Sequence, residues 1–122
     1  MPQVGSRYGG SIQPITDRRT FARLNTDARL VRSGPLVLRI LDDGYDPPRL
    51  GFALGRKFGN AVVRNRARRR LRNAFIETVD EHPNLTGTFL VGAGRKAADA
   101  SYAELRFWLG EGVAAAQEST LI

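Results

Sequence analysis

Residues 56–75 read RKFGNAVVRNRARRRLRNAF and hold eight cationic side chains and no acidic one. Six of the eight are arginines that lie between Arg64 and Arg72. Like charges spaced i and i+4 on a helix repel one another, so this crowding does not stabilise a folded chain by itself. An external polyanion that supplies the missing negative charge explains it.

The same stretch predicts a long helix from about residue 61 to residue 81. Asn60 is a suitable N-cap, and the sequence His82-Pro83 ends the helix. Residues at i, i+4, i+7, i+8 and i+11 predict a single buried stripe, formed by Ala67, Leu71, Ala74, Phe75 and Thr78. The arginines occupy most of the remaining circumference, so we expect the helix to contact polyanion on more than one side.

The charges of this helix oppose its dipole. The arginines fill its first half, and Glu77, Asp80 and Glu81 lie in its second half. Each charge placed against the macrodipole costs roughly 0.3–1 kcal/mol at low salt. A chain that retains several such charges is expected to use them for binding.

The flanking segments predict an α+β domain with one two-layer sandwich in the order α-β-β-β-α-β-α. Thr16 is the expected N-cap of a first helix that ends near Asn25, with Phe21 and Leu24 facing inward. Four strands are expected: one that starts at residues 30–31 and stops before the turn at 33–35, and three at residues 36–41, 49–54 and 87–93. Ser101 and Glu104 predict a capping box that opens the last helix. The expected divisions are a flexible tail at 1–15, a domain at 16–116 and a second tail at 117–122.

The third of these strands has an unusual alternation. Leu50, Phe52 and Leu54 share one face, whereas Gly51 and Ala53 lie on the other face. A sheet face of glycine and alanine leaves room for another backbone or a ligand to come close.

Composition narrows the class of protein. The 122 residues carry a formal net charge of +7 and a pI near 11.0, and arginine outnumbers lysine 17 to 2. Arginine binds phosphate through two parallel hydrogen bonds, so an anionic partner is expected. The absence of cysteine excludes disulfides and thiolate metal sites. No apolar run is long enough to span a membrane and no signal peptide is recognisable, so a cytoplasmic location is expected.

An independent active site is not expected. The single histidine, His82, lies at a helix end beside a proline. Asp42, Asp43 and Asp46 lie in a Gly- and Pro-containing loop that favours a solvated acidic turn. No phosphate-binding loop, metalloprotease motif or nucleophile elbow is present. We therefore predict no catalytic residue and no metal ligand in the chain.

The sequence from residue 56 onward resembles the motif of the bacterial ribonuclease P protein subunit. In that motif two basic residues precede Gly-Asn-Ala-Val, Arg-Asn-Arg and further basic residues. The flanks also agree, with Leu50-Gly51-Phe52 before the motif and Phe89-Leu90-Val91 after it. The resemblance covers about residues 16–115. The matching positions are Arg56, Lys57, Gly59, Asn60, Ala61, Val62, Arg64, Asn65, Arg66, Arg68, Arg69 and Arg72.

The resemblance implies a fold and a function. The fold is the ribosomal protein S5 domain 2-like fold with a four-stranded sheet and a left-handed βαβ crossover, an exception to the usual rule. The function is that of an RNA-binding subunit of ribonuclease P, which removes 5′ leaders from precursor tRNA by Mg²⁺-dependent hydrolysis. The chemistry belongs to the RNA, so Mg²⁺ acts through the RNA subunit. Ribonuclease P RNA and the leader are the implied partners, with no obligate protein partner and no membrane.

The resemblance also implies which residues bind RNA. A cleft between the basic helix and the sheet is expected to hold the leader, with Phe21, Arg39 and Phe52 as candidate residues. Asn25 and Arg39 stand where the family often has aromatic residues, so we expect leader binding to depend on salt more than on base identity. The candidate RNA-binding residues are Arg56, Lys57, Asn60, Arg64, Asn65, Arg66, Arg68, Arg69, Arg70 and Arg72.

Three other functions fit part of the pattern. A structural RNA-binding protein of ribosomal type shares the charge and size but does not need the Gly-Asn-Ala-Val-Val-Arg-Asn-Arg string. A helix-turn-helix DNA-binding protein would place a short helix before the basic helix, where strands are predicted here. An enzyme acting on a phosphorylated substrate would need the catalytic groups that this sequence lacks.

Overall fold

A mixed five-stranded sheet forms the centre of the computed structural model, which describes residues 12–120. Residues 1–11, which make up most of the expected tail at 1–15, lie outside the described residues. The strands are β1 (Gln13–Pro14), β2 (Arg29–Ser33), β3 (Leu36–Leu41), β4 (Arg49–Ala53) and β5 (Thr88–Ala93), and the helices are α1 (Arg18–Thr26), α2 (Ala61–Glu81) and α3 (Tyr102–Thr120). Two short 3₁₀ helices, η2 (Arg56–Phe58) and η3 (Arg95–Asp99), follow β4 and β5.

The sheet order is β1-β4-β5-β3-β2, so the expected four-stranded sheet is wrong by one edge strand. β1 pairs in parallel with the start of β4. The backbone N–H of Gln13 donates to Pro48 O at 2.9 Å, and its side chain donates to Pro47 O at 2.8 Å. Residues 13 and 14 are therefore part of the sheet and not of a tail.

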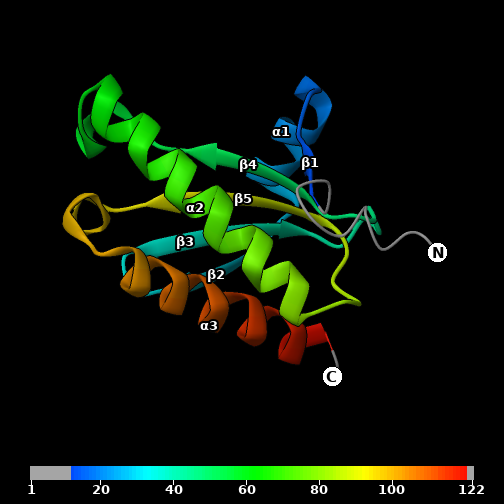
Figure 1. Ribbon diagram of the computed structural model, residues 1–122. Coiled ribbons are helices and arrows are strands. Elements are labelled where there is room, and N and C mark those ends of the chain that lie inside the picture. Colours follow the sequence, from blue (N-terminus) through cyan, green and yellow to red (C-terminus); the bar gives the residue numbers. More distant parts are fainter. Residues whose placement is uncertain (1–11, 121–122) are drawn as a thin grey trace.

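Strands β4 and β5 are parallel neighbours that α2 connects. In Figure 1 α2 lies in front of the sheet, both strands run toward the left, and β5 lies below β4. The crossover is therefore left-handed, as the resemblance implies, against the usual preference.

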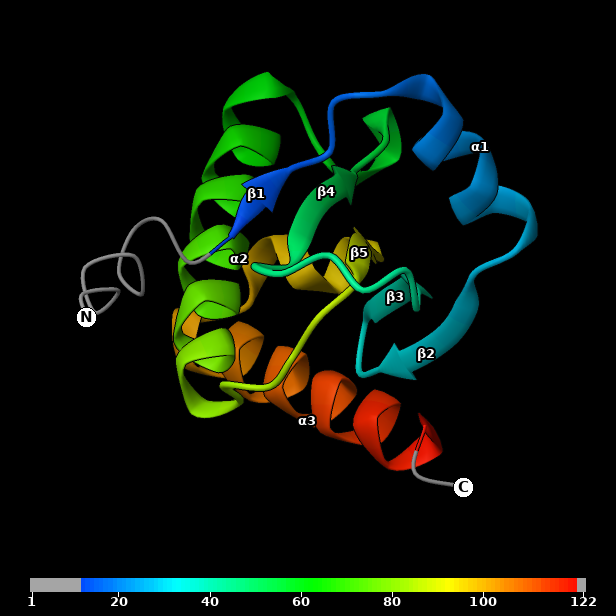
Figure 2. The ribbon, with the colours of Figure 1, turned by 90° about the vertical axis from the view of Figure 1, so that its right-hand side faces the viewer.

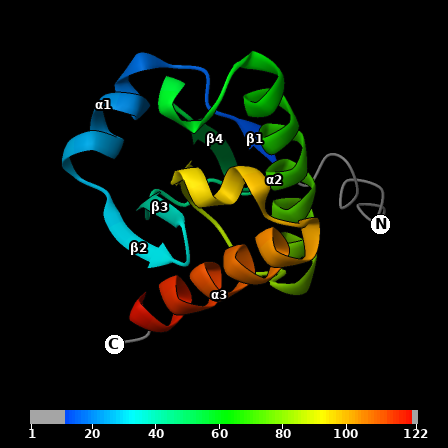
Figure 3. The same ribbon diagram turned by 90° about the vertical axis from the view of Figure 1, so that its left-hand side faces the viewer.

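The two faces of the sheet are covered unequally. Figures 2 and 3 show α2 and α3 on one face and α1 on the other. The main core lies under α2 and α3, where the expected stripe of α2 is buried against the sheet. Phe75 of α2 meets Phe89 of β5 with ring centroids 5.2 Å apart. On the other face Leu24 of α1 packs only against Leu41 and Leu90 and their neighbours, so α1 covers part of that face.

The helix ends follow local capping signals with two corrections. Asn60 caps α2 as expected, because its side chain accepts the Val63 N–H at 3.0 Å. The capping box of α3 is also confirmed, with Ser101 N–H donating to Glu104 at 2.9 Å. The N-cap of α1 is Asp17 and not Thr16. α3 continues past residue 116 to Thr120, so residues 117–120 are helical and not a tail.

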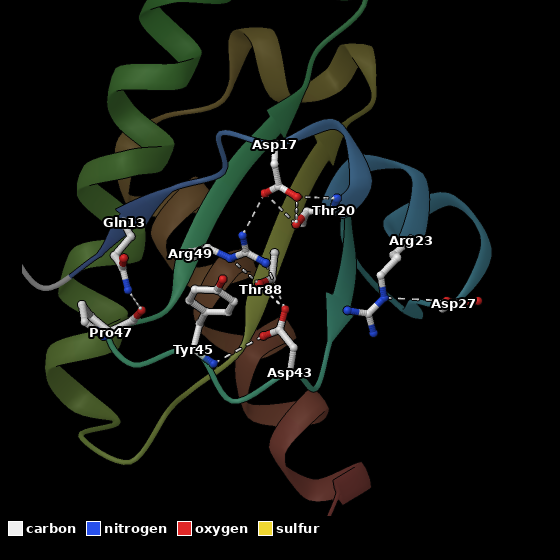
Figure 4. Close-up of polar contacts among 10 residues, drawn as sticks. All are labelled: Gln13, Asp17, Thr20, Arg23, Asp27, Asp43, Tyr45, Pro47, Arg49 and Thr88. Atoms are coloured by element: carbon white, nitrogen blue, oxygen red, sulfur yellow. Dashed lines mark hydrogen bonds and ion pairs between the residues drawn. The ribbon is translucent and has the colours of Figure 1, made fainter.

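A buried arginine joins α1 to the acidic loop (Figure 4). The Arg49 side chain is 7% exposed and forms ion pairs with Asp43 at 3.1 Å and Asp17 at 3.2 Å. It also donates to Thr88 Oγ1 at 2.9 Å and lies 3.7 Å from the centroid of the Tyr45 ring. The expectation of a solvated acidic turn is therefore wrong for Asp43, whose carboxylate is needed to compensate a buried cation.

Candidate nucleic-acid interface

The eight cations at residues 56–72, called the basic string below, lie on η2 and the first half of α2. Within residues 12–120 none of them forms an ion pair with a carboxylate, whereas Arg23, Arg29, Arg49 and Arg106 outside the string all do. In the described residues, the acidic side chains that form ion pairs therefore pair with other arginines, and the basic string has no internal compensation. An external anion remains the natural partner.

Three arginines of the string are held in place by hydrogen bonds to uncharged groups. Arg64 donates to Gly59 O at 2.9 Å, and Arg70 donates to Ala100 O at 3.3 Å. Arg68 donates to the Asn65 side-chain oxygen at 2.9 Å. A guanidinium has five N–H donors, so each of these side chains is oriented while most of its donors stay available.

Arg72 lies at another part of the surface. Its guanidinium carbon lies 5.6 Å from the centroid of the Phe52 ring. It also lines a small groove beside β1 together with Gln13 and Leu50. It is exposed and adds positive charge at the β1 edge of the molecule.

The remaining four cations, Arg56, Lys57, Arg66 and Arg69, are exposed and have no described partner.

The acidic half of α2 has a different explanation. Arg106 of α3 pairs with Glu77 at 3.1 Å and with Glu81 at 2.7 Å. These acids therefore serve helix packing, and only the basic half of α2 lacks a structural reason for opposing the dipole.

The two asparagines of the motif are partly engaged within the protein. The side-chain oxygen of Asn60 caps α2, and that of Asn65 accepts from Arg68. Each amide keeps its NH₂ group as a donor toward an external ligand. Both side chains are exposed.

The candidate aromatic residues do not lie together. Phe21 is 40% exposed on α1, so the expectation that it faces inward is wrong. Phe58 is buried, and Phe52 is half-buried against the main core. Phe52 therefore belongs to the face of the sheet that α2 covers. Arg39 is exposed on the opposite face.

The α2 stripe packs directly into the core, and the small groove beside β1, lined by Arg72 and Leu50, lies between α2 and the sheet. A groove of about 330 Å³ lies on the face that α1 leaves open. We call it the sheet groove. Its lining includes Leu30, Arg32, Val37, Arg39, Ala53 and Gly92.

A second groove of about 330 Å³ lies where α2 begins, and we call it the α2 groove. Arg66 of α2 and Arg95 of η3 both line it, together with Asn60 and Asp99. Arg32 and Arg95 were not among the binding residues predicted from the sequence. The alternation of β2 places Arg32 on the solvent side and would have identified it, whereas Arg95 is brought to Arg66 only by the fold.

No metal centre is found in the described residues. Within residues 12–120 there is no group of three or more His, Cys, Asp or Glu side chains with the spacing of a metal site. Several of the carboxylates are engaged by arginine. The hydrogen bond from Arg29 holds the pKa of Asp42 below its usual value, and that from Arg106 does the same for the pKa of Glu81. No helix in this part of the chain is both long and apolar enough to cross a membrane.

Comparison with known proteins identifies the family. The sequence model described as Ribonuclease P matches residues 12–116. The ribonuclease P protein component of Gluconacetobacter diazotrophicus is 47% identical over 82 residues, which cover 66% of this chain and 70% of that protein. The corresponding protein of Symbiobacterium thermophilum is 39% identical over 95 residues, covering 75% and 80%.

Solved structures show the same fold. The ribonuclease P protein of Staphylococcus aureus superposes with a TM-score of 0.67 at 23% identity, covering 84% of this chain and 94% of that one. The protein of Thermotoga maritima gives a TM-score of 0.66 at 22% identity, covering 80% and 91%. With its motif, its left-handed crossover and these relatives, the chain belongs to the ribonuclease P protein component family, a subunit of the ribonuclease that processes the 5′ end of tRNA.

Proposed function

We propose that the chain binds the RNA subunit of ribonuclease P through the basic string, and the 5′ leader of precursor tRNA across the open face of the sheet. The observation that carries this proposal is the set of eight cations without a carboxylate partner in the described residues. RNA binding that neutralises such a set releases counterions and is strongly salt-dependent. The family match favours this function over that of a structural ribosomal-type protein.

The two grooves lie at different places on the surface, and we assign a different RNA to each. Arg66 and Arg95 both line the α2 groove, which lies at the start of the Gly-Asn-Ala-Val motif shared with the family. We therefore assign this groove to the catalytic RNA. The sheet groove carries Arg32 and Arg39 on the opposite side of the sheet from the α2 stripe, so we assign it to the leader. Phe21 is exposed on α1, on the same side of the sheet, and is a candidate stacking platform for an unpaired base.

Mg²⁺ is the metal that the family implies. The carboxylates of this chain do not fit a protein-held site, because the described residues contain no cluster of suitable ligands. We therefore propose that Mg²⁺ is bound through the RNA subunit. The role of this chain is to add positive charge and to position two RNAs relative to each other.

The test is cleavage of a precursor tRNA at low Mg²⁺ by a bacterial ribonuclease P RNA, with and without this protein. Stimulation that increases with leader length is the expected result. Tight RNA binding without stimulation would instead support the structural ribosomal-type function. Cleavage by the protein with no RNA subunit present would show that the chain has its own active site.

A further inference from the structure

The outward side of α3 carries a charge opposite to that of the whole chain. Residues 101–122 contain three glutamates, Glu104, Glu111 and Glu118, and a single cation, Arg106. Arg106 pairs with the acidic half of α2, so its charge is compensated within the protein. The three glutamates are exposed, and within residues 12–120 none of them forms an ion pair. Their spacing of seven residues places them on one side of the helix.

An aromatic ring lies among these acids. Phe107 is 62% exposed and belongs to neither hydrophobic cluster of the described residues. Glu104, three positions before it, and Glu111, four positions after it, are its neighbours on the helix surface. We call these three residues the acidic face. A surface that complements it must offer an apolar side chain flanked by cations.

The start of α2 offers that chemistry. Val62 is 68% exposed, and it and Phe107 are the two most exposed large apolar side chains of the described residues. Arg66 and Arg69 lie four and seven positions after Val62, on the same side of α2. Both arginines are exposed and have no described partner. We call Val62, Arg66 and Arg69 the basic face.

The acidic face and the basic face lie on different parts of one chain. α3 packs against the second half of α2, where Arg106 pairs with Glu77 and Glu81. Figures 1 and 2 show the first half of α2 at the top of the molecule and α3 at the bottom. The two faces can therefore meet only between two copies of the chain. Such a contact is heterologous, so each copy can be bound on both sides.

We propose that the RNA-free chain self-associates head to tail, with the basic face of one copy docked on the acidic face of the next. Val62 packs against Phe107, and the flanking cations and acids supply each other's missing counterions. The basic face is part of the basic string, so RNA and a second copy compete for it. The self-association does not depend on the proposed function, whereas the competition with RNA rests on it.

The first test is sedimentation equilibrium of the full chain, without RNA, over a wide range of protein concentration. The salt concentration is about 0.1 M, where the Debye length is about 10 Å. At this salt the long-range repulsion between copies of net charge +7 is screened, whereas charges in contact still attract. The average mass is expected to rise with concentration above the 13.5 kDa of one chain. A mass that stays at 13.5 kDa throughout would overturn the inference.

Alanine variants with matched controls connect the association to the acidic face. Phe107→Ala should weaken it at least about tenfold, because truncating a central aromatic side chain of an interface is typically that costly. Phe21→Ala removes a ring that is 40% exposed on α1 and should leave association unchanged. Glu111→Ala should weaken association, whereas Asp46→Ala, which raises the net charge equally at an exposed loop position, should not. Equal effects of Glu111→Ala and Asp46→Ala would overturn the assignment of the acidic face.

An exchange of charges tests both faces at once. The variant R66E/R69E carries acids on both faces and the variant E104R/E111R carries cations on both, so neither should associate alone. In a mixture, the altered basic face of the first variant matches the altered acidic face of the second, and the two unaltered faces also match. The mixture should therefore recover association, which also shows that both variants are folded. A mixture that keeps the mass of single chains would overturn the pairing of these faces.

The competition with RNA has its own measurement. Two populations of the chain, labelled at the N-terminal amine with different dyes, should show energy transfer that is lost as ribonuclease P RNA is added. Energy transfer that persists while the RNA is bound would overturn the docking of the basic face. An absence of RNA binding in the same samples would overturn the proposed function and not the self-association, which the sedimentation masses decide.

Discussion

Replacing Arg66 and Arg69 by alanine tests whether the basic string meets RNA phosphate. Both side chains are exposed on α2, and neither has a hydrogen-bond or ion-pair partner in the described residues. R66A/R69A therefore removes two charges without breaking an internal contact. Arg64, Arg68 and Arg70 are poorer choices, because their replacement also deletes bonds to Gly59, Asn65 or Ala100.

The expected magnitude follows from counterion release. Each lost phosphate contact makes the slope of log K against log salt shallower by about 0.7–0.9, so the double variant should lose about 1.4–1.8. A fourfold rise in salt should then weaken wild-type binding about ninefold more than it weakens the variant. The measurement is the dissociation constant for ribonuclease P RNA, determined at a series of salt concentrations with Mg²⁺ held constant.

Arg23→Ala is the matched control for this experiment. Arg23 is also an exposed helical arginine, but Asp27 already pairs with it at 3.8 Å. Its removal should leave the salt slope unchanged and lower stability by only about 0.3–0.5 kcal/mol. A wild-type slope in R66A/R69A, or an equal loss of slope in R23A, would refute the claim that Arg66 and Arg69 meet phosphate.

Three further predictions concern stability. Arg49→Met should lower the free energy of unfolding by about 3–5 kcal/mol, because it leaves Asp43, whose side chain is 10% exposed, without its cation; a urea-unfolding loss below about 1 kcal/mol would contradict the role of this ion pair. Asn60→Asp keeps the cap and adds a negative charge at the start of α2, which should stabilise the protein by about 0.3–1 kcal/mol. The same negative charge lies beside the basic string and should weaken RNA binding. Losses of both stability and affinity would contradict this prediction. Arg29 lowers the pKa of Asp42, so this ion pair stabilises the folded state above the ordinary pKa of 3.8, and the stabilisation is lost as pH falls below that value. The thermal midpoint should therefore be level above about pH 5 and decline in acid. Arg29→Ala should reduce that decline.

Local sequence signals were sufficient for most elements. The bounds of α2, its Asn60 cap and its buried stripe were all predicted, because caps and helical periodicity act within a few residues. The alternation of β3 and the capping box at Ser101 were equally local and equally correct. The alternation of the strands also indicates that two of the proposed cleft residues, Phe52 and Arg39, lie on opposite faces of the sheet. Phe52 alternates with Leu50 on the core side of its strand, and Arg39 lies on the solvent side of β3.

Long-range pairing accounts for the predictions that were wrong. β1 is two residues long and exists only because the edge of β4 is available to it. Asp17 and Thr16 are both good caps in isolation, and Asp17 is the residue that also accepts from Arg49, thirty-two positions away in the sequence. Asp43 was predicted to be a solvated loop acid for the same reason, since its cation is supplied by the fold.

By itself, the sequence determined that residues 56–75 carry eight cations and no acidic residue, and it determined the family to which the chain belongs. Both are properties of contiguous residues. Only the tertiary structure decided which cations share a surface. Arg66 and Arg95 both line the α2 groove, and Arg32 and Arg39 both line the sheet groove. Arg106, in contrast, forms ion pairs with the acids of α2. Those placements depend on strand order and helix packing, which bring together residues that no local pattern connects.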